Sequence, residues 1–580
     1  MKESYRKDSS LRELIQMSLR YKGVTFSVVG SSIILSLAAV YRPKLIQQAI
    51  DDHMAFKNFE ELNSLLIIIV LLLLLESLFH FILVYLSNLL AQNVIRKIRT
   101  ELFEKLLGFK TFFFQKTPIG LLITRSVSDV ETVATVFNDG LFLIFGDILR
   151  IIIIIVMMYT MHSMLASLTV LTIPFMYLIT KYFQKALKKT FQEERIQTSQ
   201  LNSFAQERIS GMHIVQLFHR EAEELKKFKK INCLLTKAHF KTIFYFSLFF
   251  PVVELLSAIT IGTLITYGGW SAITHGDVKA GQIIAFIFFT YMLFRPMRQM
   301  ADRFNTIQRG LTGTERVFKL LQTDESLPDK GRLRPIRIKG HIVFDRVHFS
   351  YTEGEPVLKN LSFEIKPGEK VAIVGETGTG KSTIVQLISR LYEIDRGNIY
   401  IDGYRIETFE LENLRRHIRI MTQETFLFND SILNNVTLGA PDINLEIVQK
   451  NARKIGIHDF ITLLPQGYNQ LVQERGYSLS MGERQLIALL RILLHPYSIL
   501  VLDEATASVD DASEKLIYQA TRQLSEDKTS IIIAHRLSTI QNADKILVIH
   551  NGTLVEEGTH TSLLRSKGHY SKLYQAQYTE

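Results

Sequence analysis

Residues 371–383 read VAIVGETGTGKST, in which an apolar run, a glycine-rich loop and the start of a helix follow one another directly. Gly375, Gly380, Lys381 and Ser382 stand at the spacing GxxxxGK followed by Ser or Thr. Glycines let the backbone curl so that consecutive N–H groups converge, and the helix N-terminus adds partial positive charge. The stretch therefore predicts a phosphate-binding loop, with Lys381 at the β- and γ-phosphates and the Ser382 hydroxyl on Mg²⁺. The residues expected to contact the nucleotide here are Gly375, Glu376, Thr377, Gly378, Thr379, Gly380, Lys381, Ser382 and Thr383.

A second buried strand is predicted at residues 498–510, SILVLDEATASVD. Its apolar residues 499–502 are typical of a parallel strand covered on both faces, and such a strand delivers ligands at its carboxyl end. One carboxylate there could be a capping residue, but Asp503 and Glu504 together, after a phosphate-binding loop, indicate nucleotide hydrolysis. We expect Asp503 to hold Mg²⁺ and Glu504 to polarise the attacking water. The predicted substrate is ATP and the predicted cofactor is Mg²⁺.

Upstream of about residue 300 the composition changes to long apolar runs, such as LLIIIVLLLLL at residues 65–75. Runs of about 20 apolar residues match the hydrocarbon thickness of a bilayer, and no soluble core needs several in succession. The expected membrane spans are residues 23–40, 65–90, 141–161, 164–182, 243–270 and 283–293.

The formal net charge of the 580-residue chain is +10, which is compatible with nucleic-acid binding or with the basic cytoplasmic loops of a membrane protein. Lys and Arg gather before the first span and after the second and fourth, so we favour the second interpretation and expect no nucleic-acid partner. Six spans then return the chain to the cytoplasm, where the soluble domain would lie. Residues 1–22 carry Leu11, Leu14, Ile15 and Leu19 on one helical face, which predicts a segment along the membrane surface.

The segments after the second and fourth spans look helical well beyond the bilayer. In residues 112–133 and 204–218 a Pro or Gly interrupts a helical pattern that resumes at once. Two interpretations are open: surface hairpins without a partner, or helices that project into the cytosol and contact the soluble domain. The length of these segments favours the second.

Five ionisable residues fall in or near the predicted spans: Glu76, His80, Asp147, Arg150 and Glu254. An ionisable group inside a membrane is by default a functional hypothesis. A helix that extends beyond the bilayer can instead hold such a group in water or beside headgroups. Both interpretations stand for each residue.

With these motifs in place, nearly the whole chain resembles the exporter half-transporters of the ABC transporter superfamily. The resemblance implies that Tyr351 in FDRVHFSY stacks on adenine. It implies that Gln423 in IMTQETFLF contacts Mg²⁺ and the attacking water and links the ATP site to the membrane helices. It also implies that His535 in IIIAHRLS contacts the γ-phosphate and that Asp510 closes the loop ASVD.

In this family a signature sequence donated by a partner domain completes the phosphate site, which implies a dimer. The signature here is Leu479, Ser480, Met481, Gly482 and Glu483, against the usual LSGGQ. Ser480 and Gly482, which reach the γ-phosphate, are retained, whereas Met481 and Glu483 are departures. Glu483 would bring a carboxylate close to a polyphosphate, so we expect a heterodimer with a second half-transporter over a homodimer.

The expected fold is a membrane all-α domain of six helices fused to a cytoplasmic α/β P-loop nucleotide-binding domain of ABC type. The expected ranges are 1–22 for the N-terminal amphipathic segment, 23–320 for the transmembrane domain, 321–340 for a linker and 341–576 for the nucleotide-binding domain. The expected function is ATP-driven export of amphipathic compounds, such as drugs or lipids, across the cell (inner) membrane by alternating access. The alternatives are an ATP-gated channel and a regulatory subunit of an ABC complex. Intact Glu504 and His535 favour full turnover over gating.

Overall fold

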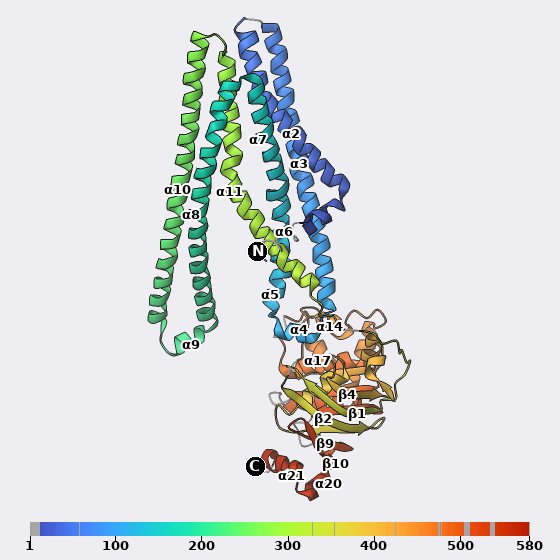
Figure 1. The fold of residues 1–580 in the computed structure, drawn as a ribbon. Coiled ribbons are helices and arrows are strands. Elements are labelled where there is room, and N and C mark those ends of the chain that lie inside the picture. The colour runs from blue at the N-terminus through green and yellow to red at the C-terminus, as the bar shows by residue number, and fades with distance from the viewer. Residues whose placement is uncertain are drawn as a thin grey trace. The chain divides into compact units, whose positions relative to one another are not determined.

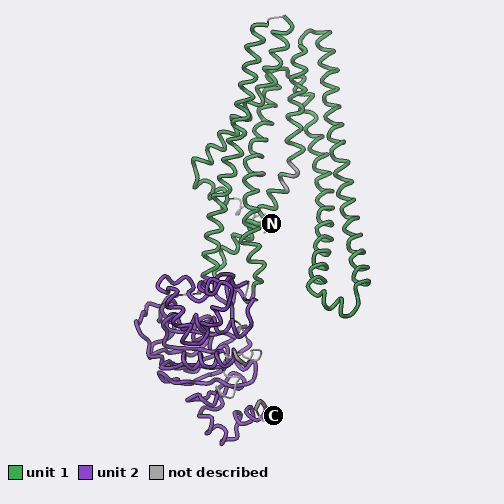
Figure 2. Tube along the Cα trace, turned by 180° about the vertical axis from the view of Figure 1, so that it is seen from behind, with its two compact units in different colours: residues 1–107, 117–324 green, residues 108–116, 325–580 purple. Residues whose placement is uncertain are grey.

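The computed structural model describes residues 12–56, 59–327, 329–352, 354–423, 425–473, 476, 478–503, 511–533 and 540–578. The chain forms two compact units (Figure 2). Unit 1 contains Met1–Leu107 and Thr117–Asp324, and unit 2 contains Gly108–Lys116 and Glu325–Glu580.

Unit 1 is entirely helical in its described residues, and six of its helical segments are long and apolar enough to cross a membrane, which confirms the predicted number. They are Lys22–Met54, Phe59–Leu107, Ile119–Met161, Ser163–Ser210, Glu221–Thr274 and Ala280–Gln299. The elements are α2 (Lys22–Gln48) with the π-helix η1 (Ala49–Met54), α3 (Phe59–Leu107), α5 (Ile119–Thr124), η2 (Arg125–Asp129), α6 (Val130–Thr135), η3 (Val136–Leu141), α7 (Phe142–Met161), α8 (Ser163–Ser210), α9 (Met212–Leu217), α10 (Glu221–Thr274) and α11 (Ala280–Gln322).

The long helices continue well past the predicted spans. The 49 residues of α3 rise about 73 Å, more than twice the roughly 30 Å of a hydrocarbon core. Helix breaks fall at Pro118, which precedes α5, and at Gly211, which separates α8 from α9. The helices α8 and α10 then run side by side as a long antiparallel pair joined through α9 (Figure 1).

The apolar surface of unit 1 divides into a packed interior and an exposed exterior. Val40, Ile154 and Phe286 belong to a buried cluster between helices, whereas Leu74 and Phe81 of α3 are 62% and 66% exposed. Contiguous exposed apolar side chains of this extent need a lipid environment. Helices satisfy their own backbone hydrogen bonds, so they tolerate that environment.

Unit 2 contains two sheets. A four-stranded antiparallel sheet has the order β2-β1-β4-β5, and a six-stranded sheet has the order β10-β9-β3-β8-β7-β6, parallel except for β10. The strands are β1 (Ile342–Ser350), β2 (Pro356–Ile365), β3 (Lys370–Val374), β4 (Arg396–Ile401), β5 (Tyr404–Arg405), β6 (Ile418–Met421), β7 (Ile499–Asp503), β8 (Thr529–Ile533), β9 (Lys545–His550) and β10 (Thr553–Gly558). The main helices are α12 (Lys381–Ile388), α13 (Leu411–His417), α14 (Ile432–Thr437), α15 (Leu445–Lys454), α16 (His458–Leu463), α17 (Met481–Leu493), α18 (Asp511–Leu524), α20 (His560–Ser566) and α21 (His569–Tyr578). Two buried apolar clusters form its core, and they contain residues from opposite faces of the strands in the six-stranded sheet.

The segment Gly108–Lys116, which includes α4 (Thr111–Lys116), packs within unit 2 although it lies inside the range 23–320 expected for the transmembrane domain. The backbone N–H of Lys110 donates to the carbonyl of Glu325 at 2.9 Å. Phe112 packs against one of the two core clusters. The range 321–340 expected for a linker begins in the last turn of α11 and then contacts unit 2, where Arg332 donates its N–H to Thr408.

Candidate functional site: a nucleotide-phosphate site

The parallel sheet aligns the two predicted phosphate and metal elements. Ile533 of β8 stands in register with Ile373 of β3 on one side and with Asp503 of β7 on the other. Since these strands run in the same direction, the loop that follows β3 and the carboxylate of Asp503 emerge at one edge of the sheet. Strand β8 is buried throughout, and β3 and β7 are buried except for Lys370 at the start of β3 and Asp503 at the end of β7.

The glycine-rich loop has a backbone that side chains would not permit. Gly378 and Gly380 have φ of 85° and 99°, values that favour glycine. A Cβ at Gly375 would lie 2.2 Å from the carbonyl oxygen of Ile549, and one at Gly380 would lie 2.6 Å from Leu358. The tip of the loop, residues 376–378, is exposed. The loop is therefore a close-packed turn with an open outer side.

Lys381 is held against this loop. Its Nζ donates to the carbonyl oxygens of Gly375 at 2.7 Å and Glu376 at 2.8 Å, and the residue is 7% exposed. Burial lowers the pKa of Lys381, and the negative charges of Asp503 and Glu376 oppose that shift. The ammonium group is thus positioned before any nucleotide binds, and among the described residues it has no ion-pair partner in contact.

The residues at this edge fit a magnesium nucleotide. The hydroxyl of Ser382 donates to Oδ2 of Asp503 at 3.3 Å, which places two hard oxygen ligands side by side. The first turn of α12 has no side-chain cap, so its N–H groups are available to phosphate oxygens. A triphosphate would meet these N–H groups and the Lys381 ammonium, and Mg²⁺ would meet Ser382 and Asp503.

Tyr351 lies beside the phosphate loop but is held by neighbours. Its hydroxyl donates to Gln386 at 2.6 Å and lies 3.1 Å from the hydroxyl of Thr383. Its ring packs edge-on against Tyr392, with centroids 5.2 Å apart. Tyr392 in turn donates to Gln115 at 2.6 Å, from the segment Gly108–Lys116. A continuous set of contacts thus joins the P-loop helix to that segment, and the sequence alone did not indicate it.

Gln423 follows β6, whose Met421 is in register with Leu502 of β7, so it emerges at the same sheet edge as Asp503. Its side chain is exposed. Glu504, Asp510 and His535 lie outside the described residues, and their predicted roles stay predictions.

The signature residues form a local structure that the comparison with LSGGQ missed. Ser480 is the N-cap of α17: its Oγ accepts from the N–H of Glu483 at 3.2 Å, while Glu483 Oε2 accepts from the N–H of Ser480 at 2.7 Å. This is a capping box, and the pattern Ser-x-x-Glu before an apolar run is its sequence signal. Gly482 is buried in the same first turn. Within the described part of the chain, Ser480 and Gly482 make no hydrogen bond with the phosphate loop.

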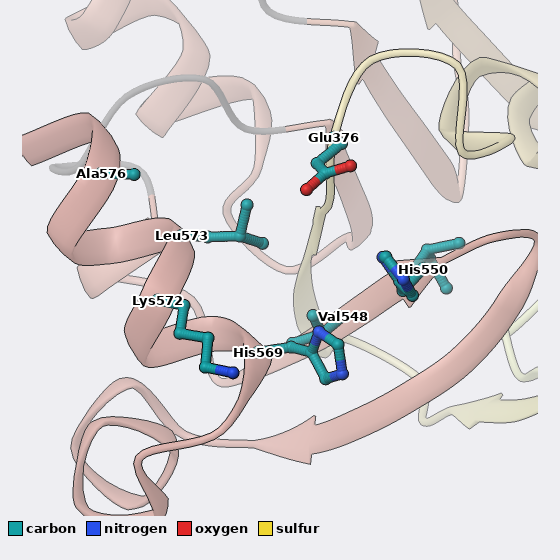
Figure 3. A pocket seen from close by; sticks show the side chains of 8 residues that line it. Glu376, Val548, His550, His569, Lys572, Leu573 and Ala576 are labelled. Atoms are coloured by element: carbon teal, nitrogen blue, oxygen red, sulfur yellow. The ribbon is translucent and has the colours of Figure 1, made fainter.

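A separate cavity of about 220 Å³ lies behind the loop. Figure 3 shows the Glu376 side chain on one wall, Leu573 and Ala576 of α21 opposite, and His550 and His569 near the base. The Glu376 backbone therefore contributes to the phosphate loop while its carboxylate faces the C-terminal helix.

These observations define a class of protein. Six apolar helices that need lipid share one chain with a parallel sheet that brings a phosphate loop and a metal-binding carboxylate together. Comparison with known families matches residues 25–297 to the ABC transporter transmembrane region and residues 358–507 to the ABC transporter family. The chain belongs to the ABC transporter family and is an exporter of the half-transporter type.

Individual relatives are similar in sequence to this chain over nearly its whole length. It is 34% identical to an ATP-dependent lipid A-core flippase of Syntrophus aciditrophicus, over 95% of this chain and 91% of the relative. It is also 34% identical to a putative multidrug export ATP-binding/permease protein of Staphylococcus aureus, over 98% of this chain and 100% of the relative. The fold matches the structure of a bacterial Atm1-family ABC exporter with ATP bound, with a TM-score of 0.78 and 27% sequence identity. The match covers 96% of this chain and 99% of that exporter chain.

Membership of the ABC transporter family establishes the general activity of the chain. The chain is a multi-pass membrane protein with a cytoplasmic domain that hydrolyses ATP, with Mg²⁺ as cofactor, and couples the hydrolysis to export. Exporters of this kind act as dimers, so the chain works with a second half-transporter subunit.

Proposed function

We propose that the chain exports amphipathic compounds, drugs or lipids, by alternating access, and that its own P-loop carries the hydrolytic half of one ATP site. The observation that carries the proposal is the placement of Lys381, Ser382 and Asp503 at one sheet edge, in a chain with six helices long and apolar enough to cross a membrane. The names of its relatives, which include a lipid flippase, a fatty acid transporter and a multidrug exporter, support an amphipathic cargo.

Each site residue has a proposed role. Lys381 and the first-turn N–H groups of α12 hold the β- and γ-phosphates, and Ser382, Asp503 and Gln423 hold Mg²⁺, which neutralises phosphate charge when bound. Tyr351 stacks on adenine, Glu504 orients the attacking water, and His535 contacts the γ-phosphate. Ser480 and Gly482 act on the nucleotide of the partner subunit.

We propose further that the partner is a different half-transporter, with an ordinary LSGGQ signature and a replaced catalytic carboxylate. The carboxylate of Glu483 supports this assignment. Repulsion between like charges a few ångströms apart in a partly dry site raises the free energy of nucleotide binding by about 1 kcal/mol or more. The bulky Met481 also stands where a glycine lets the backbone come close to its ligand. Such a signature suits a partner site that turns over slowly.

The test is Glu504→Gln in the full-length protein. The amide keeps the size of the side chain and its hydrogen bonding but removes the charge that orients water. We expect nucleotide binding to persist and the MgATP hydrolysis rate to fall by about 100-fold or more. Lys381→Ala should instead weaken nucleotide binding itself. If the Glu504→Gln protein kept most of its hydrolysis rate, the assignment of the catalytic carboxylate would be wrong.

A further inference from the structure

A cavity of about 510 Å³ lies within unit 1 among α2, α3, α7 and α11. Its lining carries an unusual concentration of charge for a membrane domain. The ionisable side chains are Arg42, Glu76, His80, Asp147, Arg150, Arg295 and Arg303. Three hydroxyls and an amide, from Ser32, Ser36, Ser77 and Gln299, add polar groups.

Glu76, Arg150 and Arg295 fall inside three of the helical segments that are long and apolar enough to cross a membrane. At 1.5 Å of rise per residue, Arg150 stands roughly 16 Å from the end of α7 at Met161, and Arg295 roughly 22 Å from the start of α11 at Ala280. Glu76 stands roughly 26 Å from the start of α3. A bilayer core is about 30 Å thick, so each of these three groups lies within one hydrocarbon thickness of that helix end.

Two of the arginines are neutralised within the cavity. Arg42 Nη1 lies 3.3 Å from Glu76 Oε2, and Arg303 forms an ion pair with Asp147. The other two, Arg150 and Arg295, have no ion-pair partner among the residues whose side chains the structure describes. Arg150 Nε and Glu76 Oε1 are also buried without a hydrogen bond. Among the described side chains of the lining, four guanidinium groups thus face two carboxylates, and positive charge is in excess.

Uncompensated charge within membrane-spanning helices strongly destabilises a membrane domain unless something neutralises it. We propose that this cavity binds the anionic headgroup of the cargo, a group with about two negative charges such as a phosphomonoester, through Arg150 and Arg295. The planar guanidinium fork matches phosphate oxygens in geometry as well as charge. The inference rests on the proposed function and narrows its amphipathic cargo to anionic amphiphiles.

The rest of the lining fits the same ligand. The walls away from the charges are apolar and are formed by Leu35, Leu73, Leu83, Phe142, Leu143 and Met292. A volume of this size suits a headgroup with its first carbons and leaves long acyl chains to the surrounding lipid. The two internal ion pairs hold their helices in place: Arg42 with Glu76 joins α2 to α3, and Arg303 with Asp147 joins α11 to α7.

The test measures binding without ATP. The full-length protein, in the complex it forms, is placed in phosphatidylcholine nanodiscs, and the affinity for fluorescent phosphatidic acid is measured. We expect Arg150→Gln and Arg295→Gln each to weaken binding by about tenfold or more. Arg150→Lys, which retains the charge, should keep much of the affinity and guards against simple misfolding. Arg298→Gln is the matched control, because Arg298 lies on the same helix but pairs with Glu254 at 2.9 Å outside the cavity.

Competitors identify the source of the anion. Displacement by unlabelled phosphatidic acid alone identifies a lipid headgroup, whereas displacement by glycerol 3-phosphate or inorganic phosphate identifies a soluble phosphate, and both support an anion site. Displacement by the lipophilic cation tetraphenylphosphonium, or equal binding by wild type and both glutamine variants, would overturn the proposal. Intact phosphatidic acid binding without ATP-driven export would count against the exporter function and leave the cavity assignment standing.

Discussion

Glu483 ties the first turn of α17 together through two hydrogen bonds with Ser480. The same side chain is the charged departure from the usual signature, so it combines a local structural role with an electrostatic one. Glutamine also forms capping boxes, which separates the two roles experimentally. A neutral amide keeps both bonds, whereas alanine keeps the bond from the residue 483 backbone N–H to Ser480 Oγ and loses only the bond that the Ser480 N–H donates to the side chain.

We therefore expect Glu483→Ala to destabilise the protein by about 0.5–1.5 kcal/mol, the usual net contribution of one hydrogen bond, while Glu483→Gln leaves its thermal unfolding temperature unchanged. In the complex with its partner, Glu483→Gln should raise ATP turnover at the partner's site, because a like charge beside the phosphates is removed. Thermal unfolding and steady-state hydrolysis measure the two effects. Equal destabilisation by Gln and Ala would show that the cap needs the charge.

His495 is expected to make the folding stability of the protein depend on pH. Burial lowers its pKa, and the nearby positive charges of Arg419 and Arg491 lower it further. Its Nε2 is buried without a hydrogen bond. Between this lowered pKa and the ordinary histidine pKa of about 6.5, the unfolded chain binds more protons than the folded one, so stability falls as the pH falls.

Acidification from about pH 7.5 to about pH 5.5, a range that spans the ordinary histidine pKa, should lower the unfolding temperature of the wild type more than that of His495→Gln. His213→Gln, at an exposed histidine, serves as the control and should follow the wild type. Parallel pH curves for the wild type and His495→Gln would exclude this histidine as a source of the acid sensitivity.

At the scale of elements, the short helix α4 belongs structurally to unit 2 while its neighbours in sequence, α3 and α5, belong to unit 1. It is held by the hydrogen bond from Tyr392 to Gln115 and by the edge-on packing of Phe112 against Tyr392, with centroids 6.2 Å apart. Tyr392 also packs against Tyr351, which contacts α12. These contacts connect the P-loop helix to α4 through two tyrosines.

Tyr392→Phe removes one hydrogen bond worth about 1 kcal/mol and keeps the ring. We expect hydrolysis to continue near the wild-type rate while the amount of cargo exported per ATP falls. Tyr404→Phe is the matched control, because the Tyr404 side chain is 57% exposed and makes no described hydrogen bond. An unchanged ratio of export to hydrolysis in Tyr392→Phe would remove this contact from the coupling route.

At the scale of the whole molecule, the chain supplies two different parts to a dimer. Lys381, Ser382 and Asp503 are proposed to serve its own nucleotide, and Ser480 and Gly482 are proposed to contribute to the nucleotide of the partner. The residues proposed to carry hydrolysis are all present in the sequence, whereas its signature departs from the usual form. The two ATP sites of the complex are therefore expected to differ.

The asymmetric model predicts that the chain purified alone hydrolyses ATP slowly and does not couple it to transport. Fast hydrolysis coupled to transport should appear when a second half-transporter is added. The signature of that partner should complete the ATP site at the P-loop of this chain. Steady-state assays give the ATP hydrolysis rate, and uptake into proteoliposomes gives the transport that is coupled to it. A homodimer that tolerates a variant signature is the alternative, and fast, transport-coupled hydrolysis by the pure homodimer would establish it.

The sequence alone was sufficient for the P-loop, the buried strand before Asp503 and the six spans. These features depend on short spacings and uninterrupted runs, because a loop of fixed geometry needs particular residues at fixed intervals and a bilayer needs a minimum apolar length. Their chemistry is local, so neighbouring residues specify it. The helix breaks at Pro118 and Gly211 follow from backbone preferences in the same way.

Only the tertiary structure decided which distant residues meet. It set the Ser382 hydroxyl beside Asp503 across β8, and it placed α4 on Tyr392. From the sequence, Glu76, Asp147 and Arg150 were isolated charges open to two interpretations, and Arg42, Arg295 and Arg303 gave no signal. Four helices bring them together in one cavity, while Glu254 pairs with Arg298 elsewhere. The energy of a buried charge depends on partners that packing supplies from other parts of the chain, and no local pattern encodes those partners.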